Sequence, residues 1–400
     1  MILVVNAGSS SIKFKLYDIS QKNNPISLVE GLAERIKVDG ALTIKMNDKK
    51  HQFDDKMDDH LMAVKSILNR FKELKVIENI EDIKGIGFRV VHGGDKIVKP
   101  VELTDENKKT IEENIRLAPL HNPGALTAIE AFEKGLPNAK LVGCFDTSFH
   151  QTMPEKSFLY TVPYSWYKEY KVRKYGFHGI SFDYITEECA KIFNKKKEKL
   201  NLIICHLGNG ASMCCVKHGQ SFDTTMGLTP LAGLMMGTRS GDIDASILQY
   251  MAKELNKDVY EITDILNKQS GLLGISEISS DMRDITNEAF HKGENANRAY
   301  LTLELYSERV AEYIVKYANH LQGNVDAIVF TAGIGENSSV IRSWAMERVK
   351  LMNIEIDKEK NEADYDLYME ISTPNSDVPV FKIRTDEELM ICKETLKFLK

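Results

Sequence analysis

Residues 1–18 read MILVVNAGSSSIKFKLYD, and this stretch decides the fold. The apolar run 2–5 predicts a buried strand, and the alternation over 12–17 predicts a half-buried second strand. Between them, residues 6–11 form a turn of small residues whose amides and hydroxyls suit an anion. Lys13 adds a cation just beyond the turn. A phosphate-binding turn and an ordinary polar hairpin both fit these residues, and the turn lacks the G-x-x-x-x-G-K-[ST] pattern of a P-loop.

The opening pattern returns 200 residues later. Residues 202–205 (LIIC) are apolar, 206–212 (HLGNGAS) form a second small-residue turn, and 213–216 predict a return strand. Two such units in two halves indicate a duplicated α/β architecture. Because 400 residues exceed what one core usually holds, we expect two domains. Their expected bounds are 1–149 with 384–400, and 150–383.

Composition and charge argue against several functional classes. The net charge is −6, from 52 basic and 58 acidic residues, so no broad surface for nucleic acid or an anionic membrane is expected. No apolar run approaches the ~20 residues of a membrane span, and no signal peptide fits the start of the sequence. The six cysteines show no C-x-x-C spacing. They predict buried free thiols in a reducing compartment, which indicates the cytoplasm.

Polar residues follow several predicted strands. Residues 86–91 predict a strand with Arg89 and Val91 on one face, and it runs into glycines. Residues 141–145 predict a strand that delivers Asp146 at its tip, where ligand groups collect in α/β sheets.

Two further glycine-rich segments belong to the second half. Residues 226–244 hold four glycines around Arg239, which predicts a loop whose amides can approach a ligand. Residues 325–330 predict a strand, followed by a Gly-x-Gly turn at 333–335 and a helix, which is an arrangement typical of nucleotide binding.

Capping signals place several helices. Ser181 predicts the start of a helix that reaches residue 193. Residues 295–321 predict a long helix whose apolar stripe serves core packing or, alternatively, a dimer face. Thr385 with Glu388 predicts a capping box at the start of the last helix.

Ten segments, taken together and in order, resemble the acetate kinases, which form the acetokinase family of short-chain carboxylic acid kinases. The resemblance covers the chain from residue 6 to residue 389; the family usually has Pro where this chain has Ala245. It implies an α/β fold of two domains, the duplicated ribonuclease-H-like fold of the sugar kinase, Hsp70 and actin superfamily. The matching segments are 6–13 (NAGSSSIK), 88–95 (FRVVHGGD), 121–124 (HNPG), 146–150 (DTSFH), 175–181 (YGFHGIS), 206–212 (HLGNGAS), 233–244 (GLMMGTRSGDID), 281–283 (DMR), 333–337 (GIGEN) and 385–389 (TDEEL).

The resemblance also implies ligands and residue roles. ATP and ADP are the co-substrates, Mg²⁺ (replaceable by Mn²⁺) is held by Asn6 and Glu387, and the protein is a homodimer. Glu387 has an alternative reading, because a carboxylate in a first helical turn is favoured by the helix dipole alone. The implied nucleotide-binding residues are Lys13, His206, Leu207, Gly208, Asn209, Gly210, Asp281, Met282, Arg283, Gly333, Ile334, Gly335, Glu336 and Asn337. The implied acid-binding residues are Arg89, Val91, Leu120, His121, Phe177 and Pro230, and the implied catalytic residues are Arg89, Asp146, His178 and Arg239.

The chemistry of the two arginines fits these roles. A carboxylate substrate and a transferring phosphoryl group both suit the planar fork of a guanidinium better than an ammonium. By resemblance, Arg89 binds the acid and Arg239 stabilises the transition state. The family's catalytic carboxylate is Asp146, often described as handling a proton. An acetate-like acid has a pKa of about 4 and is already ionised at pH 7, so we expect Asp146 to position other groups rather than remove a proton.

The expected reaction is ATP + acetate ⇌ ADP + acetyl phosphate by direct in-line transfer, with domain closure excluding water. The nearest alternative is a propionate or butyrate kinase, because pocket contacts discriminate one methylene by only ~1–3 kcal/mol. A remote alternative is an actin-like or Hsp70-like ATPase that binds a protein. Arg239 and His178 within glycine-rich segments argue against it, as does the lack of a further peptide-binding domain.

Overall fold

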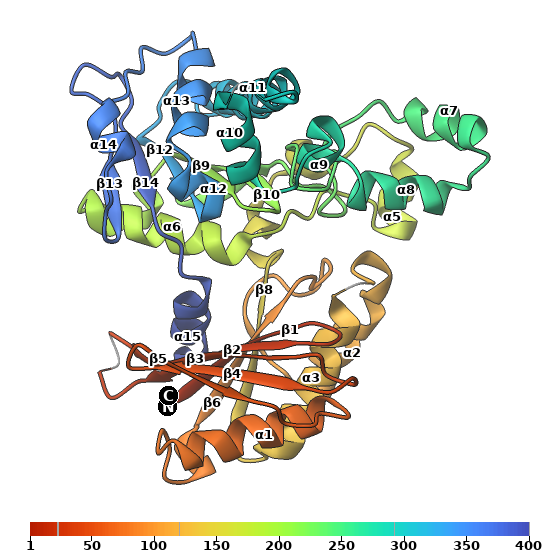
Figure 1. Ribbon diagram of the computed structural model, residues 1–400, viewed down its shortest axis with the longest axis vertical. Coiled ribbons are helices and arrows are strands. Elements are labelled where there is room, and N and C mark those ends of the chain that lie inside the picture. The colour runs from red at the N-terminus through yellow and green to blue at the C-terminus, as the bar shows by residue number, and fades with distance from the viewer. Residues whose placement is uncertain (22–23, 120, 292, 400) are drawn as a thin grey trace. The chain divides into compact units, whose positions relative to one another are not determined.

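The computed structural model describes residues 1–399 apart from 22, 23, 120 and 292. The chain folds as two compact units (Figure 1). The N-terminal unit comprises Met1–Gln151 and Asp386–Lys400, and the C-terminal unit comprises Thr152–Thr385.

The N-terminal unit is built on an eight-stranded sheet of order β5-β4-β3-β2-β1-β6-β8-β7. Its strands are β1 (Ile2–Ala7), β2 (Ile12–Asp18), β3 (Ile26–Glu34), β4 (Ala41–Met46), β5 (Lys49–Phe53), β6 (Gly85–Val90), β7 (Val101–Glu102) and β8 (Lys140–Phe145). Its helices are α1 (His60–Glu73), α2 (Asp105–Glu113), α3 (Asn122–Gly135) and α15 (Glu387–Lys397), with short 3₁₀ turns at Ile80–Asp82, Ile115–Leu117 and Ser148–Thr152.

The C-terminal unit is built on a six-stranded sheet of order β11-β10-β9-β12-β14-β13. Its strands are β9 (Leu202–Leu207), β10 (Ala211–Lys217), β11 (Gln220–Thr224), β12 (Ala327–Thr331), β13 (Tyr368–Glu370) and β14 (Val380–Ile383). Its helices are α4 (Glu155–Phe158), α5 (Tyr164–Tyr170), α6 (Gly179–Ile192), α7 (Ser246–Leu255), α8 (Val259–Lys268), α9 (Gly271–Ser276), α10 (Met282–Phe290), α11 (Ala296–His320), α12 (Ala332–Asn337), α13 (Ser339–Arg348) and α14 (Lys358–Glu362), with a 3₁₀ turn at Lys197–Lys199.

The two sheets share one plan. In the first, β1, β2 and β3 form an antiparallel meander, and β6 and β8 join parallel to β1. In the second, β9, β10 and β11 form the same meander, and β12 and β14 join parallel to β9. The predicted duplication is therefore confirmed, and each half has the ribonuclease-H-like strand order.

Helices cover both faces of the strand β6 in the N-terminal unit. On β6, a side chain at Gly87 would meet Ile391 and Thr395 of α15, while the next residue, Phe88, packs edge-on against Phe132 of α3. Neighbouring residues of a strand point to opposite faces, so α15 and α3 lie on opposite sides of the sheet. The missing side chain at Gly87 allows the close contact with α15.

The long helix α11 serves mainly the core of its own unit. Its buried stripe is Tyr306, Val310, Ile314 and Tyr317, whereas Leu301, which the sequence placed in the same stripe, is 49% exposed. Of the two readings of this stripe, the structure bears out core packing.

Three helix starts differ from the predictions. The helix α6 begins at Gly179 after His178, so Ser181 lies in its first turn and is not its cap. The last helix is capped by Asp386, whose carboxylate accepts from the Leu389 amide at 2.8 Å, so the capping box of Thr385 with Glu388 is wrong. Residues 332–337 form the short helix α12 where an open Gly-x-Gly turn was expected.

Candidate active site

Arg89 lies among carboxylates in the N-terminal unit. Its Nε donates to Asp146 Oδ1 at 3.0 Å and its Nη2 donates to Oδ2 at 2.8 Å, so the pair is bidentate. Its Nη1 lies 3.2 Å from Glu387 Oε2. Arg89 belongs to β6, Asp146 directly follows β8, and Glu387 opens α15. The parallel strands therefore bring a predicted acid-binding residue, a predicted catalytic residue and a predicted metal ligand into one cluster.

The charges of this cluster are interdependent. Burial by itself would lower the pKa of Arg89, but the neighbouring Asp146 and Glu387 carboxylates outweigh it and raise that pKa. Burial raises the pKa of Glu387, and the Asp146 charge adds to the effect, while Arg89 opposes it. Arg89 is therefore a fixed cation whose orientation is set by two acids.

The small-residue turn after β1 is held by contacts of Gly8 with Ser11 and His60. The Gly8 amide donates to the Ser11 carbonyl at 2.8 Å, and Ser9 and Ser10 are exposed at its tip. The buried His60 has its Nε2 3.0 Å from the Gly8 carbonyl oxygen. Lys13, predicted to contact phosphate, is paired in this structure with Glu388 at 2.5 Å.

The HNPG segment has a bracing role that sequence reasoning missed. The Asn122 side chain accepts from the His92 amide at 3.3 Å and donates to the His92 carbonyl at 3.0 Å. A Cβ at Gly124 would lie 2.8 Å from the Gly8 carbonyl carbon, so only glycine lets α3 approach the turn this closely. The motif gave a signal for this role, because Asn and Gly in a first helical turn are unusual choices for helix stability.

In the C-terminal unit, the predicted nucleotide segments surround the turn after β9. The Gly237 amide donates to the Asn209 carbonyl at 2.9 Å, and a Cβ at Gly237 would lie 3.2 Å from the carbonyl oxygen of Ser280, the residue before Asp281. A Cβ at Gly335 would lie 3.4 Å from the Cys205 carbonyl oxygen. The fold thus gathers the segments at 206–210, 281–283 and 333–337, and it adds the arginine loop to them.

Arg239 occupies a glycine-rich loop in which its cation has no acidic neighbour. Its Nη1 donates to the Pro230 carbonyl at 3.1 Å, and none of the ion pairs within the described part of the chain includes it. Burial lowers its pKa from the usual value. The loop is compact because Gly233 and Gly241 adopt positive φ angles of 97° and 72°, where a side chain would meet backbone atoms.

His178 is strained and held from two sides. Its φ of 57° places it in the left-handed region, which is uncommon for a residue other than glycine and concentrates at functional sites. Its Nδ1 lies 2.8 Å from Ser212 Oγ, and its ring stacks on that of His206 with centroids 4.2 Å apart. A Cβ at Gly210 would lie 3.6 Å from both His178 Nε2 and Arg239 Nη1, so these two side chains flank one glycine.

A buried carboxylate steadies the segment that leads into His178. Asp223 lies 2.6 Å from Lys174 Nζ and 2.9 Å from Lys316 Nζ, with His320 Nε2 at 3.7 Å. Burial alone would raise the pKa of Asp223, but His320 and the two lysines hold it well below its usual range. Lys174 is thereby tied to α11, which carries Lys316 and His320.

The GIGEN segment, which forms most of α12, is held by Glu336 and Arg342. Glu336 Oε1 accepts from the Ala332 amide at 2.9 Å, at a residue whose φ is 64°. The buried Arg342 donates to the carbonyls of Gly335 and Glu336 at 2.8 and 2.9 Å, and burial lowers its pKa to about 10.

The remaining predicted residues are less concentrated. Asp281 caps α10 and pairs with Arg283, whose hydrogen bonds lower the pKa of Asp281 to about 2. Val91 is half-buried after β6, and His121 is exposed at the start of α3. Phe177 is buried beside His178, Pro230 contacts Arg239 as described, and Leu120 lies outside the described residues.

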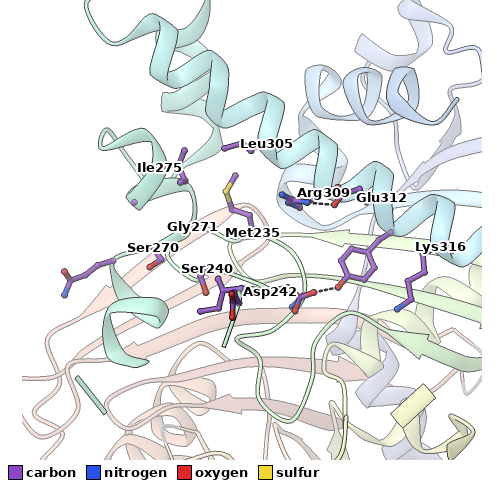
Figure 2. Close-up of a pocket in the computed structure, with 16 residues that line it drawn as sticks. Met235, Ser240, Asp242, Ser270, Gly271, Ile275, Leu305, Arg309, Glu312 and Lys316 are labelled. Carbon is purple, nitrogen blue, oxygen red and sulfur yellow. Dashed lines mark hydrogen bonds and ion pairs between the residues drawn. The ribbon is translucent and has the colours of Figure 1, made fainter. Parts of the chain in front are cut away.

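A cavity of about 800 Å³ lies behind the arginine loop (Figure 2). Ser240 and Asp242, which follow Arg239, line it together with Arg309, Tyr313 and Lys316 of α11. The Tyr313 hydroxyl donates to Asp242, and Asp242 Oδ1 accepts from the Gly233 amide at 2.8 Å. The cavity contains none of the predicted site residues, but its wall shows that α11 supports the loop that carries Arg239.

Comparison with known proteins identifies the family of this chain. The sequence profile described as the acetokinase family matches residues 1–393. The chain belongs to the acetokinase family. It is 57% identical over 400 residues to the acetate kinase of Mycoplasma mycoides subsp. mycoides SC, with all of both chains covered.

Solved members of the acetokinase family have the same fold. The crystal structure of Porphyromonas gingivalis acetate kinase matches with a TM-score of 0.94 at 39% identity, covering 100% of this chain and 99% of that one. The structure of a propionate kinase from Francisella tularensis subsp. tularensis SCHU S4 matches with a TM-score of 0.91 at 40% identity, covering 99% of each. The predicted family and fold class are confirmed.

Three further findings bear on this acetokinase. Across the described residues, no helix is both long enough and apolar enough to span a bilayer. In the same residues, no three His, Cys, Asp or Glu side chains gather in a way that could hold a metal ion. All six cysteines are buried and free, as the sequence predicted.

Proposed function

We propose that this acetokinase transfers the γ-phosphoryl group of ATP to acetate, giving acetyl phosphate and ADP, and that the reaction is reversible. The observation that carries the proposal is the 57% identity to an acetate kinase over the whole length of both chains. The reaction is a direct displacement: the acetate oxygen forms the new P–O bond while the bond between the γ-phosphorus and the bridging oxygen of ADP breaks.

The two arginines would have separate tasks. Arg89, oriented by Asp146 and Glu387, offers a guanidinium suited to the carboxylate of the acid. Arg239, a partly desolvated cation without an acidic neighbour among the described residues, suits the charge that spreads over the equatorial oxygens of the transferring phosphoryl group. His178, held beside Arg239 across Gly210, would donate to the same group.

Asp146 would act through Arg89. Its two carboxylate oxygens are both occupied by the guanidinium, which supports an orienting role and leaves the attacking acid to react as the anion it already is. The acid would be accommodated by Val91, Leu120, His121, Phe177 and Pro230, as the resemblance implies.

Mg²⁺, or Mn²⁺ in its place, would be held by Asn6 and Glu387. Both residues belong to the N-terminal unit and offer hard oxygen ligands, and Glu387 is a half-buried carboxylate at the start of α15. Mg²⁺ commonly takes only one or two protein ligands and keeps water or phosphate oxygens for the rest, so this donor set fits it. When bound, the cation would neutralise phosphate charge.

The nucleotide would occupy the C-terminal unit, with the phosphates at 206–210 and the ribose and adenine at 281–283 and 333–337. The contacts that join these segments through Asn209, Gly237 and Gly335 support this assignment. The N-terminal unit would then supply Asn6 and Glu387 for the metal and Arg89 for the acid.

A hydroxamate assay with acetate, propionate and butyrate tests the proposal. We expect acetate to give the highest kcat/KM, with propionate lower by about tenfold because one methylene changes binding by ~1–3 kcal/mol. ATP hydrolysis without any acyl hydroxamate would overturn the assignment.

Propionate kinase is the second candidate. The identity to the Francisella propionate kinase is 40%, within one percentage point of the 39% identity to the Porphyromonas acetate kinase. A higher kcat/KM with propionate than with acetate in the same assay would favour it.

The protein would be a cytoplasmic homodimer. None of the side chains of α7, all of which the structure describes, is buried. Tyr250 on α7 is 64% exposed and Tyr260 on α8 is 80% exposed, on two helices that extend away from the rest of their unit (Figure 1). An apolar face of this kind is typical of an interface. Light scattering should show a dimer that dissociates in Tyr250→Asp and persists in the control Leu351→Asp, which alters an exposed leucine outside these helices. The buried free thiols support a reducing compartment.

A further inference from the structure

Thr385 is the last residue of the C-terminal unit, and the chain enters the N-terminal unit at Asp386. The residues that follow it have defined tasks. Asp386 caps α15, and Glu387 contacts Arg89 at 3.2 Å. Thr385 therefore directly precedes the segment that caps α15 and contacts Arg89.

Thr385 is held at both its backbone and its side chain. Its amide donates to Glu336 Oε1 at 3.1 Å, the same oxygen that accepts from the Ala332 amide. Its hydroxyl lies 2.8 Å from the hydroxyl oxygen of Ser181. Ser181 is fully buried, and its hydroxyl oxygen also lies 2.8 Å from Nδ1 of His206.

Both routes lead to segments of the nucleotide site. Glu336 belongs to the segment 333–337. His206 begins the segment 206–210 and stacks on His178. Neither contact of Thr385 is needed to start the last helix, because Asp386 caps it. The hydroxyl of a capping residue would point to its own helix, whereas this one joins Ser181 on α6.

We propose that Thr385 is a positioning residue for the nucleotide segments: its hydroxyl meets the Ser181 hydroxyl that holds His206, and its amide meets the Glu336 carboxylate. This inference rests on the proposed function, because it assigns the segments 206–210 and 333–337 to the nucleotide. All of these residues belong to the C-terminal unit, so the network acts within that unit. Nucleotide affinity should therefore fall when the Thr385 hydroxyl is lost.

The other crossing between the units offers a matched control. Thr152 begins the C-terminal unit, and its hydroxyl donates to the Ser221 carbonyl at 2.8 Å. Ser221 is not among the predicted site residues. The same Thr→Val change at 152 and at 385 therefore removes one hydroxyl at each crossing: the one at 152 donates to β11, and the one at 385 joins the network of the nucleotide segments.

The experiment compares Thr385→Val, Thr385→Ser and Thr152→Val with the unaltered chain. ADP binding is measured by calorimetry in the presence of Mg²⁺. One lost hydrogen bond corresponds to a change of about threefold to tenfold. We expect Thr385→Val to weaken ADP binding by that factor, Thr385→Ser to stay within about twofold, and Thr152→Val to leave the affinity unchanged.

Ser181→Ala and the double variant Ser181→Ala/Thr385→Val test whether the shared hydrogen bond is responsible. If it is, the double variant loses no more than the larger single loss, because the two changes remove one interaction. Unchanged ADP affinity in Thr385→Val would overturn the inference. So would equal losses in Thr385→Val and Thr152→Val, or strictly additive losses in the double variant.

The two readouts separate this inference from the proposed function. Calorimetry with ADP needs no turnover, so it tests the network even if neither acetate nor propionate is a substrate. Absent hydroxamate formation by the unaltered chain overturns the proposed function, whereas normal turnover with an unaffected Thr385→Val overturns only the role of Thr385.

Discussion

Arg89 and Arg239 are the same side chain in opposite electrostatic settings. Arg89 is bonded through three nitrogens to Asp146 and Glu387, and these carboxylates raise its pKa. Arg239 has carbonyl and thioether neighbours, no ion pair among the described residues, and a pKa lowered by burial. Arg89 is thus oriented by charges that also neutralise it, while no acid among the described residues neutralises Arg239.

This difference separates two ways of preparing a cation. Two neighbouring acids hold a guanidinium in one orientation. The same acids weaken its attraction for an anion. A guanidinium held by carbonyls keeps its full attraction for an anion, and burial of its charge lowers the stability of the folded protein. The first suits a substrate that must be aligned, and the second suits charge that develops during the reaction.

The largest expected effect is that of Arg239→Gln. Because its charge is not balanced by an acid, its loss should lower kcat by about 10³-fold, the size reported for arginines that stabilise phosphoryl transfer. The same change removes a desolvated cation, so the unfolding midpoint should stay within about 2 °C. Arg309→Gln, on α11 and paired with Glu312, is the control and should leave kcat unchanged. Full turnover in Arg239→Gln would contradict this distinction between Arg239 and Arg89.

A smaller loss is expected for Asp146→Asn. Removing one orienting charge from Arg89 should lower kcat by about 10²-fold and the free energy of unfolding by about 2 kcal/mol, because a hydrogen-bonded charge pair is broken. The two arginines then differ in a measurable way, since only the Arg89 cluster couples activity to stability. Urea unfolding and steady-state rates provide both values.

The pH dependence of the same variant decides between orientation and proton transfer. With an acid that is already ionised, kcat of the unaltered chain should be flat from about pH 6 to pH 8. A limb that appears in the unaltered chain and disappears in Asp146→Asn would give Asp146 the role of a base.

The smallest expected effect concerns His92, which follows the strand of Arg89. It is fully buried, burial lowers its pKa to about 4, and its Nδ1 accepts from the Gly94 amide at 3.0 Å. The unfolded chain binds the proton near pH 6.5, so stability falls as pH drops from about 6.5 towards 4. Between pH 7 and pH 5 this residue should cost about 2 kcal/mol, and His92→Asn should lose correspondingly less. An equal loss in both proteins would show that His92 does not cause this pH dependence.

Sequence reasoning reached the fold because its signals were local. Apolar strands next to glycine turns at 2–12 and 202–212 defined both halves, and the strand tips placed Arg89 and Asp146 at one edge of a sheet. The chemistry of the side chains also indicated the kind of substrate before any coordinates were considered.

Contacts between distant segments could not be read from the sequence. Ser181 and Thr385 both match capping patterns, and nothing local shows that their hydroxyls meet across 204 positions. Likewise, Gly124 reads as a poor helix residue until the Gly8 turn is found against it. The environment of each arginine depends on such long-range packing, so the difference between Arg89 and Arg239 emerged only in three dimensions.

The repeated strand order has an evolutionary consequence. Arg89 lies on β6, a strand that the plan of both halves contains, whereas Arg239 lies in the long excursion between β11 and α11, which interrupts that plan. The strand that corresponds to β6 in the second half is β12, and it carries no arginine. A duplicated scaffold therefore accounts for the strand that carries Arg89 but not for this pair of cations. The second arginine belongs to the segment that interrupts the shared plan, so duplication of that plan does not explain its position.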